Sequence, residues 1–276
     1  MKSSRLSKRL YWMSVISLSI LYLWPKPFNH VLKEISSKIE CENAPDAWDI
    51  LDEGLYSLGK RYNLIQYRLL KESGVKFTVH APFLQTDYLN PNPKARRKSI
   101  TLLKSSMERA ALLSPLSYVF HPTTIPKGYS RDTLKVEHYN FLEEIVDFAK
   151  SLGLNVYLEN HVPGMGHMFT EPEEFIEFYE RTGSSLGLAF DVGHANIGSN
   201  VKRFLDLLTD KIGVVHVHDN DGASDSHKMI GSGTVDWKYV ISKLRSSEFR
   251  GPYIIECVQQ PFKSLQVLRS FLNYKP

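Results

Sequence analysis

Short runs of apolar and β-branched residues alternate along the chain with longer stretches in which apolar residues recur every three or four positions. Several short runs are almost continuously apolar, as in Val-Val-His-Val-His at 214–218, which is typical of parallel strands covered on both faces. The pattern predicts strands at Met13–Leu21, Trp48–Leu51, Lys76–His80, Ser117–His121, Asn155–Glu159, Gly187–Asp191, Gly213–His218 and Tyr253–Cys257.

The longer stretches predict helices, most clearly at Lys94–Leu113, Leu134–Ser151 and Pro172–Thr182. His30 and His138 fall in helical stretches, and we expect both at the surface. Strand and helix alternate eight times, which indicates a parallel sheet, and the number eight favours closure. A chain of 276 residues has room for one such domain, so we predict a single (β/α)8 TIM barrel of the α/β class.

The first 24 residues have two interpretations. A basic start precedes the mostly apolar run Leu10–Trp24, which resembles a signal peptide or a short membrane anchor. The run is shorter than the ~20 residues that cross a bilayer, serines interrupt it, and the barrel needs it as a first strand. We therefore expect a basic, disordered tail at 1–12 and the barrel at 13–276, with Met13 as a candidate functional start.

Charge and cysteine content narrow the function classes. The net charge of +4 equals the number of basic residues among the first nine positions, so the remainder is balanced, unlike a typical nucleic-acid-binding domain. We expect the basic run Lys94–Lys98 to be a solvated first helical turn. Two distant cysteines argue against a disulfide framework and for a reducing, cytoplasmic location, with Cys257 packed in the core. A membrane is not an expected partner, and an oligomer is left open.

Metal-ligand residue types gather where the predicted strands end. Because the strands of a barrel run the same way, their C-terminal ends form one ring around a shared mouth, where barrel active sites lie. The residues at these ends and in the loops that follow are His80, His121, Glu159, Asp191, His194, His216, Asp225, His227 and Glu256.

A divalent metal ion explains this ring better than packing does. A cluster of unpaired carboxylates would repel itself, and a bound cation removes that repulsion. Imidazole and carboxylate together suit zinc, manganese, iron or cobalt, and we expect one to three ions, with zinc or manganese favoured. Asn160 and His218 lie beside the ring, and we expect them to contact a substrate or to support the ligands.

At this point the sequence resembles the xylose isomerase-like TIM barrel superfamily, which includes sugar-phosphate isomerases and epimerases as well as endonuclease IV. The most specific stretches are His216-Val-His-Asp-Asn-Asp-Gly, Asp225-Ser-His227 and Gly231-Ser-Gly-Thr-Val-Asp-Trp237. The resemblance covers nearly the whole chain and implies a metal-dependent enzyme.

The resemblance implies two different uses of the ring. In the epimerase-like branch, one metal is held by Glu159, Asp191, His216 and Glu256, the two glutamates move protons at a metal-bound enediolate, and His194 holds a sugar oxygen. In the endonuclease IV branch, all nine ring residues hold three zinc ions that cleave abasic DNA. Ligand number matches the second branch. The local sequences Phe-Asp-Val-Gly-His and His-Ala-Pro-Phe differ from those typical of that branch, and Thr-Val-Asp-Trp is the isomerase-type ending.

We therefore predict a divalent-metal-dependent isomerase or epimerase of a small sugar or sugar phosphate, with an abasic-site endonuclease as the alternative. A metal-holding barrel that binds a sugar without catalysis is a third possibility. No glycine-rich phosphate loop marks a phosphate-binding group.

Overall fold

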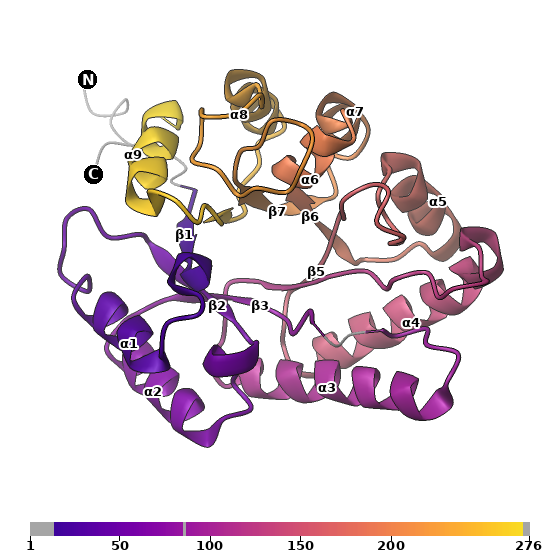
Figure 1. Cartoon of the computed structure of the whole chain (residues 1–276), viewed down its shortest axis with the longest axis horizontal. Coiled ribbons are helices and arrows are strands. Elements are labelled where there is room, and N and C mark those ends of the chain that lie inside the picture. Colours follow the sequence, from indigo (N-terminus) through magenta and orange to yellow (C-terminus); the bar gives the residue numbers. More distant parts are fainter. Residues whose placement is uncertain (1–13, 85–86, 273–276) are drawn as a thin grey trace, which may run out of the picture.

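The computed structural model describes residues 14–84 and 87–272 and shows a closed parallel barrel with strand order β1 to β8 (Figure 1). Each strand pairs in parallel with the next, and β8 pairs with β1. The strands are β1 (Ile16–Ser19), β2 (Ala47–Leu51), β3 (Phe77–His80), β4 (Tyr118–Phe120), β5 (Val156–Glu159), β6 (Gly187–Asp191), β7 (Ile212–Val217) and β8 (Tyr253–Ile255). The predicted single TIM barrel is thereby confirmed.

Helices surround the barrel, as Figure 1 shows. They are α1 (Phe28–Ser36), α2 (Arg61–Glu72), α3 (Pro93–Ala111), α4 (Arg131–Ser151), α5 (Pro172–Thr182), α6 (Val192–Ile197), α7 (Val201–Leu207), α8 (Trp237–Ser246) and α9 (Pro261–Phe271). Short 3₁₀ turns follow β1 at Ile20–Leu23 and β2 at Gly54–Tyr56.

The first strand is shorter than the sequence pattern predicts. β1 covers Ile16–Ser19, and the 3₁₀ turn takes the following apolar residues because the Ser19 hydroxyl accepts a hydrogen bond from the backbone of Leu21. The proposed tail at 1–12 and start at Met13 lie outside the described residues. Within the described ranges, no helix has both the length and the apolar composition to span a membrane.

Capping residues, proline and glycine determine where several helices begin and end. Asn92 caps α3 and Pro93 occupies its first turn, so the basic run that follows is solvated as expected. α5 begins as predicted at Pro172, where the Glu171 and Glu174 side chains cap the first turn reciprocally. α4 ends at Ser151, and Gly153 follows with φ of 69°, a conformation that glycine adopts without strain.

Two apolar layers build the core. The larger lies between the sheet and the helices and includes the buried Cys257, as predicted. The smaller fills the barrel interior with Val119, Ala189, Val214 and Ile254 against Tyr157. Gly187 and Gly213 make room for that tyrosine, because a Cβ at either position would lie within 2.4 Å of its ring. The lower barrel is therefore packed shut, and only the C-terminal end of the strands is available for chemistry.

His138 departs from the sequence prediction. His30 is exposed on α1 as expected, but His138 on α4 is fully buried, so its predicted surface position is wrong. Its ring packs against Phe141 and Phe169, and neither ring nitrogen has a hydrogen-bond partner. Burial lowers the pKa of His138 to about 3, so the ring is neutral at physiological pH.

Candidate metal centre

The predicted ring residues converge at the C-terminal ends of β3 to β8. Strand register brings them together. His80 pairs with Val119, two residues before His121, and Asp191 pairs directly with His216. All nine predicted ligands contact at least one other member through an ion pair or hydrogen bond of 3.8 Å or less. The structure thus brings together every residue that the sequence singled out as a ligand.

A central group lies at the ends of β5 to β8. The Nδ1 atom of His216 is 3.4 Å from Glu159 Oε2, 3.7 Å from Asp191 Oδ2 and 3.4 Å from Glu256 Oε2. All four side chains are at least 93% buried. Three carboxylates around one buried imidazole form a donor set that a single cation can satisfy.

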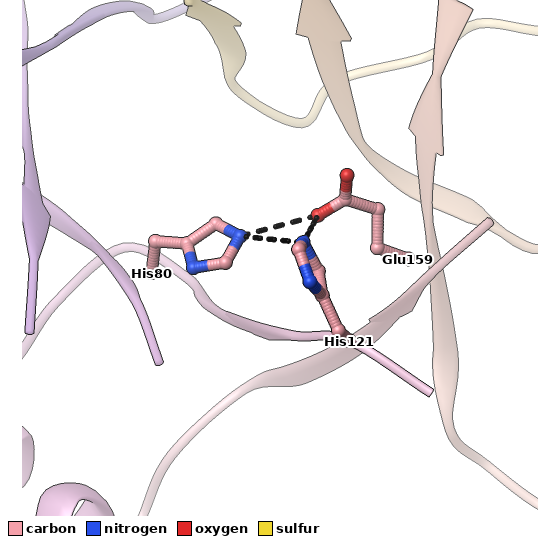
Figure 2. A group of neighbouring side chains, drawn as sticks. All are labelled: His80, His121 and Glu159. Atoms are coloured by element: carbon pink, nitrogen blue, oxygen red, sulfur yellow. Dashed lines mark hydrogen bonds and ion pairs between the residues drawn. The ribbon is translucent and has the colours of Figure 1, made fainter. Parts of the chain in front are cut away.

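One flank of the centre consists of His80, His121 and Glu159, and we call it the β3–β5 flank (Figure 2). The two imidazole Nε2 atoms are 3.2 Å apart, and each lies 3.3 Å from Glu159 Oε2. Figure 2 shows the three donor atoms pointing toward one another. Glu159 belongs to this flank and to the central group, so its carboxylate can bridge two ion positions.

The opposite flank is built from α6 and the loop after β7, and we call it the β6–β7 flank; its members are His194, His218, Asp225 and His227. Asp225 Oδ2 lies 3.4 Å from His194 Nε2 and 3.2 Å from His227 Nε2. His227 has φ of 43°, an unfavourable backbone conformation for a side chain with a Cβ. Such strain tends to occur where function fixes a residue.

Backbone carbonyl groups orient three of the imidazoles. The Nδ1 atoms of His80, His194 and His227 donate 2.9 Å hydrogen bonds to the carbonyl oxygens of Ala81, Asn160 and Glu256. With the proton on Nδ1, Nε2 of the neutral ring presents its lone pair to the neighbouring carboxylates. This arrangement is characteristic of histidines that hold metal ions.

Electrostatics bind the cluster together. Burial acts to lower the pKa of His216, but the carboxylates of Glu256 and Glu159 outweigh it and hold the pKa well above the usual range. Burial acts to raise the pKa of Glu159, yet His216 and His121 hold it well below its usual range. The carboxylates therefore stay ionised, as metal ligands must be.

The orphaned nitrogens of His216 indicate that the residues fit a metal ion. Both ring nitrogens are buried and neither has a hydrogen-bond partner, which is costly for an imidazole in a protein interior. A cation bonded to Nδ1 would satisfy one nitrogen and neutralise the surrounding carboxylates. The mixture of imidazole and carboxylate donors suits zinc or manganese, and the number of ions stays a prediction.

Asp219 supports the β6–β7 flank without belonging to it. Its carboxylate accepts hydrogen bonds from the backbone of Asn220, Gly231 and Val235 and from the Trp237 indole. Gly233 allows this packing, because a Cβ there would lie 2.1 Å from the Asn220 carbonyl oxygen. The His-Val-His-Asp motif and the Gly-Ser-Gly-Thr-Val-Asp-Trp motif are thereby joined around one buried carboxylate.

Asn160 and His218, the expected substrate contacts, are both fully buried. Asn160 links β5 to β6, because its amide donates to the Asp191 carbonyl and accepts from the Asp191 backbone. His218 Nε2 lies 3.1 Å from both Asp191 carboxylate oxygens. Their contact with substrate stays a prediction, and the structure adds a positioning role for Asn160.

Sequence reasoning missed an inner polar layer below the ligands. Asp49 on β2 is buried and accepts a hydrogen bond from Thr78, which in turn contacts Ser17. Burial, followed by the Glu256 carboxylate, raises the pKa of Asp49 to about 6. The sequence feature that could have predicted this layer is the occurrence of polar residues within β1, β2 and β3. An unpaired polar side chain is rare in a barrel interior, so polar residues there indicate a hydrogen-bonded group.

Aromatic rings line the mouth above the donors. Phe83 lies 5.5 Å from the His80 ring and 5.8 Å from the His121 ring, measured between centroids. On the other side, His161 lies 4.9 Å from the His121 ring and stacks on His167 at 3.5 Å. Phe83 also borders a surface cavity of about 320 Å³, whose lining includes Leu84 and Thr124 but no member of the β3–β5 flank.

Comparison with known proteins connects this centre to a family. The family model described as xylose isomerase-like TIM barrel matches residues 67–273. An uncharacterized protein of Methanocaldococcus jannaschii is 30% identical over 99% of this chain and 94% of its own length. The crystal structure of a D-tagatose 3-epimerase-like protein superposes with a TM-score of 0.83 and 28% identity, covering 94% of this chain and 97% of its own.

More distant relatives fall on both sides of the functional alternatives. An inosose isomerase of Bacillus velezensis is 24% identical over 64% of this chain and 65% of its own length. A probable endonuclease 4 of Pediococcus pentosaceus is 27% identical over 62% of each chain. A Thermus thermophilus protein soaked with ZnCl2 shares the fold, with a TM-score of 0.72 and 22% identity over 95% of this chain and 99% of its own. The chain belongs to the family of xylose isomerase-like TIM barrels.

Proposed function

We propose that this protein is a divalent-metal-dependent isomerase or epimerase of a small sugar or sugar phosphate. The observation that carries the proposal is the pair of buried glutamates, Glu159 and Glu256, each 3.4 Å from the same nitrogen of His216. The similar D-tagatose 3-epimerase-like and inosose isomerase proteins support the substrate class. The exact sugar, a cytoplasmic location and an oligomer remain predictions.

Glu159, Asp191, His216 and Glu256 would hold the ion in this enzyme. When bound, a divalent ion supplies Lewis acidity toward the carbonyl and hydroxyl oxygens of a sugar. Glu159 and Glu256 come from different strands, β5 and the end of β8, so they reach the mouth from different sides. In the proposed reaction, one carboxylate removes a proton from the carbon next to the sugar carbonyl and the other returns one.

The neighbouring side chains have proposed roles too. His194 has two candidate roles, as a metal ligand and as a holder of a sugar oxygen, and the Asn160 carbonyl fixes its ring for either. The aromatic rings of Phe83 and His161 line the mouth and exclude water from one side. Exclusion of water strengthens every electrostatic interaction at the reacting carbon.

Deuterium exchange tests the proton transfer directly. Protein loaded with manganese or zinc is incubated in D2O with a panel of ketoses, such as D-tagatose, D-allulose and L-ribulose. We expect deuterium at the carbon next to the carbonyl of at least one sugar, with loss of that signal in Glu256→Gln. Full exchange in Glu256→Gln would overturn the proposed mechanism, and no exchange with any sugar would overturn the substrate class.

A second function is favoured by the His80, His121 and Glu159 group. Those residues complete the nine-member set that the endonuclease IV resemblance assigns to three zinc ions, and a probable endonuclease 4 is among the relatives. Cleavage of abasic-site DNA is therefore the alternative proposal. Incision of an abasic oligonucleotide by the zinc-loaded protein, absent in His80→Asn, would support it over the sugar reaction.

A further inference from the structure

The outer face of α2 carries a row of large apolar side chains that the described residues leave about half exposed. Tyr62, Ile65 and Leu69 are 60%, 44% and 50% exposed. They follow one another at three- and four-residue spacing, so they lie along one side of the helix. A surface helix normally turns such a row toward the core. The inward face of α2 is already formed by other residues, which are Asn63, Tyr67 and Leu70.

This row distinguishes α2 from the other α-helices. Among the described residues, α4 and α7 each expose one large apolar side chain, Val136 and Leu207, and the remaining α-helices expose none. Single exposed apolar residues are ordinary on a soluble protein, whereas a contiguous group marks a contact surface. Figure 1 shows α2 at the periphery of the molecule beside α1, where a partner can reach its outer side.

Charged side chains lie beside the apolar row. Arg61, Arg68 and Glu72 are exposed, and the 100° rotation per residue of a helix places them on the same outer face of α2. None of the three forms an ion pair with another described residue. Arg61 and Glu72 stand at opposite ends of the helix, about 16 Å apart, so they cannot pair within one chain.

The outer face of α2 is complementary to itself in one arrangement. A two-fold axis that sets two α2 helices antiparallel places the apolar rows against each other and the charged rows against each other. Tyr62 of one copy then faces Leu69 of the other, and Ile65 lies near the axis. Arg61 of each copy faces Glu72 of the other, so the opposite charges meet twice. A parallel arrangement would instead set an apolar row against a charged one.

We propose that the outer face of α2 is covered by the same face of a second copy of this chain, in a two-fold symmetric dimer. The complementary charges at the two ends of one helix identify the occupant as this chain itself. α2 has 12 residues and is about 18 Å long, so the contact is smaller than the ~1,600 Å² of a standard interface. We therefore expect a weak dimer, with a dissociation constant in the micromolar range.

Cysteine cross-linking locates the contact. Cys41→Ser provides the background, because Cys41 is exposed whereas Cys257 is buried. In that background, we expect Ile65→Cys to give a disulfide-linked dimer on mild oxidation, seen on a non-reducing gel. Val136→Cys on α4 is the matched control, since Val136 is 60% exposed, and we expect about tenfold less dimer from it. Equal yields from the two positions would overturn the proposal.

Sedimentation measures the dimer without cross-linking. We expect the wild type to pass from monomer to dimer as its concentration rises, and Ile65→Glu to raise the dissociation constant by about tenfold or more, because the contact would bury an unpaired carboxylate. Val136→Glu should leave the constant unchanged. A wild type that stays monomeric up to millimolar concentration would overturn the proposal and leave the face to a partner of another kind.

Exchange of the two end charges tests the antiparallel order. We expect Arg61→Glu and Glu72→Arg each to weaken the dimer by about threefold, since each sets like charges against each other at both ends of the contact. The double variant restores opposite charges and should dimerise like the wild type. Weakened single variants without rescue in the double variant would overturn the antiparallel contact. Metal content and sugar turnover play no part in these measurements, so failure of the proposed enzyme activity and failure of the dimer are distinguishable.

Discussion

The two flanks of the centre share residue types but differ in the exposure of their carboxylate. The β3–β5 flank has three donors, and the His121 side chain is 20% exposed beneath Phe83 and His161. The β6–β7 flank places three histidines around Asp225, whose side chain is 30% exposed, and its His218 is completely buried under the His227 ring. Solvent therefore reaches the carboxylate of the second flank, whereas Glu159 on the first flank is only 1% exposed.

This difference bears on whether an ion bound at each flank could take part in a reaction or would only stabilise the structure. A metal ion takes part in a reaction when a coordination position is open to substrate or water, and it stabilises structure when the protein fills every position. Similar sets of histidine and carboxylate can thus serve either purpose within one barrel. The exposure of a donor to solvent, more than its identity, decides which purpose is served.

Loss of Glu159 is expected to have the largest effect, because its carboxylate serves both the central group and the β3–β5 flank. We expect Glu159→Gln to lose the ions of both groups and to lower turnover by about 10³-fold or more. Elemental mass spectrometry and the ketose exchange assay measure the two losses. Glu137→Gln, on the surface of α4, is the matched control. Retention of all metal in Glu159→Gln would show that Glu159 is not a ligand shared by the two groups.

Replacing one histidine on each flank tests the comparison itself. We expect His80→Asn and His227→Asn each to remove about one zinc ion, because each replaces one imidazole donor of its flank. Sugar turnover should survive His80→Asn within about tenfold, because the central group stays complete. An unchanged zinc content in either variant would show that its histidine is not a ligand.

Asp219 tests whether the β6–β7 flank depends on its scaffold. We expect Asp219→Ala to lower the free energy of unfolding by about 3 kcal/mol, because three backbone N–H groups and an indole N–H lose their acceptor. Urea unfolding of the metal-free protein measures the change. Asp221→Asn breaks a surface ion pair with Lys228, which water screens, and should leave stability nearly unchanged.

The smallest effect on the centre is expected from His138, which belongs to neither flank. Its folded pKa of about 3 lies below the ordinary value of 6.5, so the unfolded chain binds the proton more readily as pH falls. Stability is therefore lost below pH 6.5, by about 1.4 kcal/mol between pH 7.5 and pH 5.5. We expect His138→Phe to remove this component from urea unfolding curves of the metal-free protein. Identical pH slopes in both proteins would contradict it.

Residue type and strand order were sufficient to predict the ring of ligands. His80, Glu159 and Asp191 each end a strand, and parallel strands in a barrel leave no other place for them to meet. The division into flanks was not predictable, because it depends on side-chain directions in loops. His218 illustrates this, since a two-residue period places it beside His216, while the structure turns it under His227.

Two other misses have different causes. The surface prediction for His138 overlooked its spacing from Leu134, Leu142 and Ile145, which places it on the buried face of α4. β1 ends early because the Ser19 cap starts a 3₁₀ turn, a competition between side chain and backbone that apolar periodicity does not register. The first error was avoidable from the sequence, whereas the second required the structure.

The closure of the barrel by β1 and β2 divides the chain into a part without proposed ligands and a part that carries all of them. Every proposed ligand lies between residues 80 and 256, inside the segment that matches the family model, whereas β1 and β2 lie before it. Those two strands complete the wall and the polar floor but contribute no proposed ligand. The first quarter of the chain therefore serves the centre by closing its wall, whereas the remainder supplies the donor atoms.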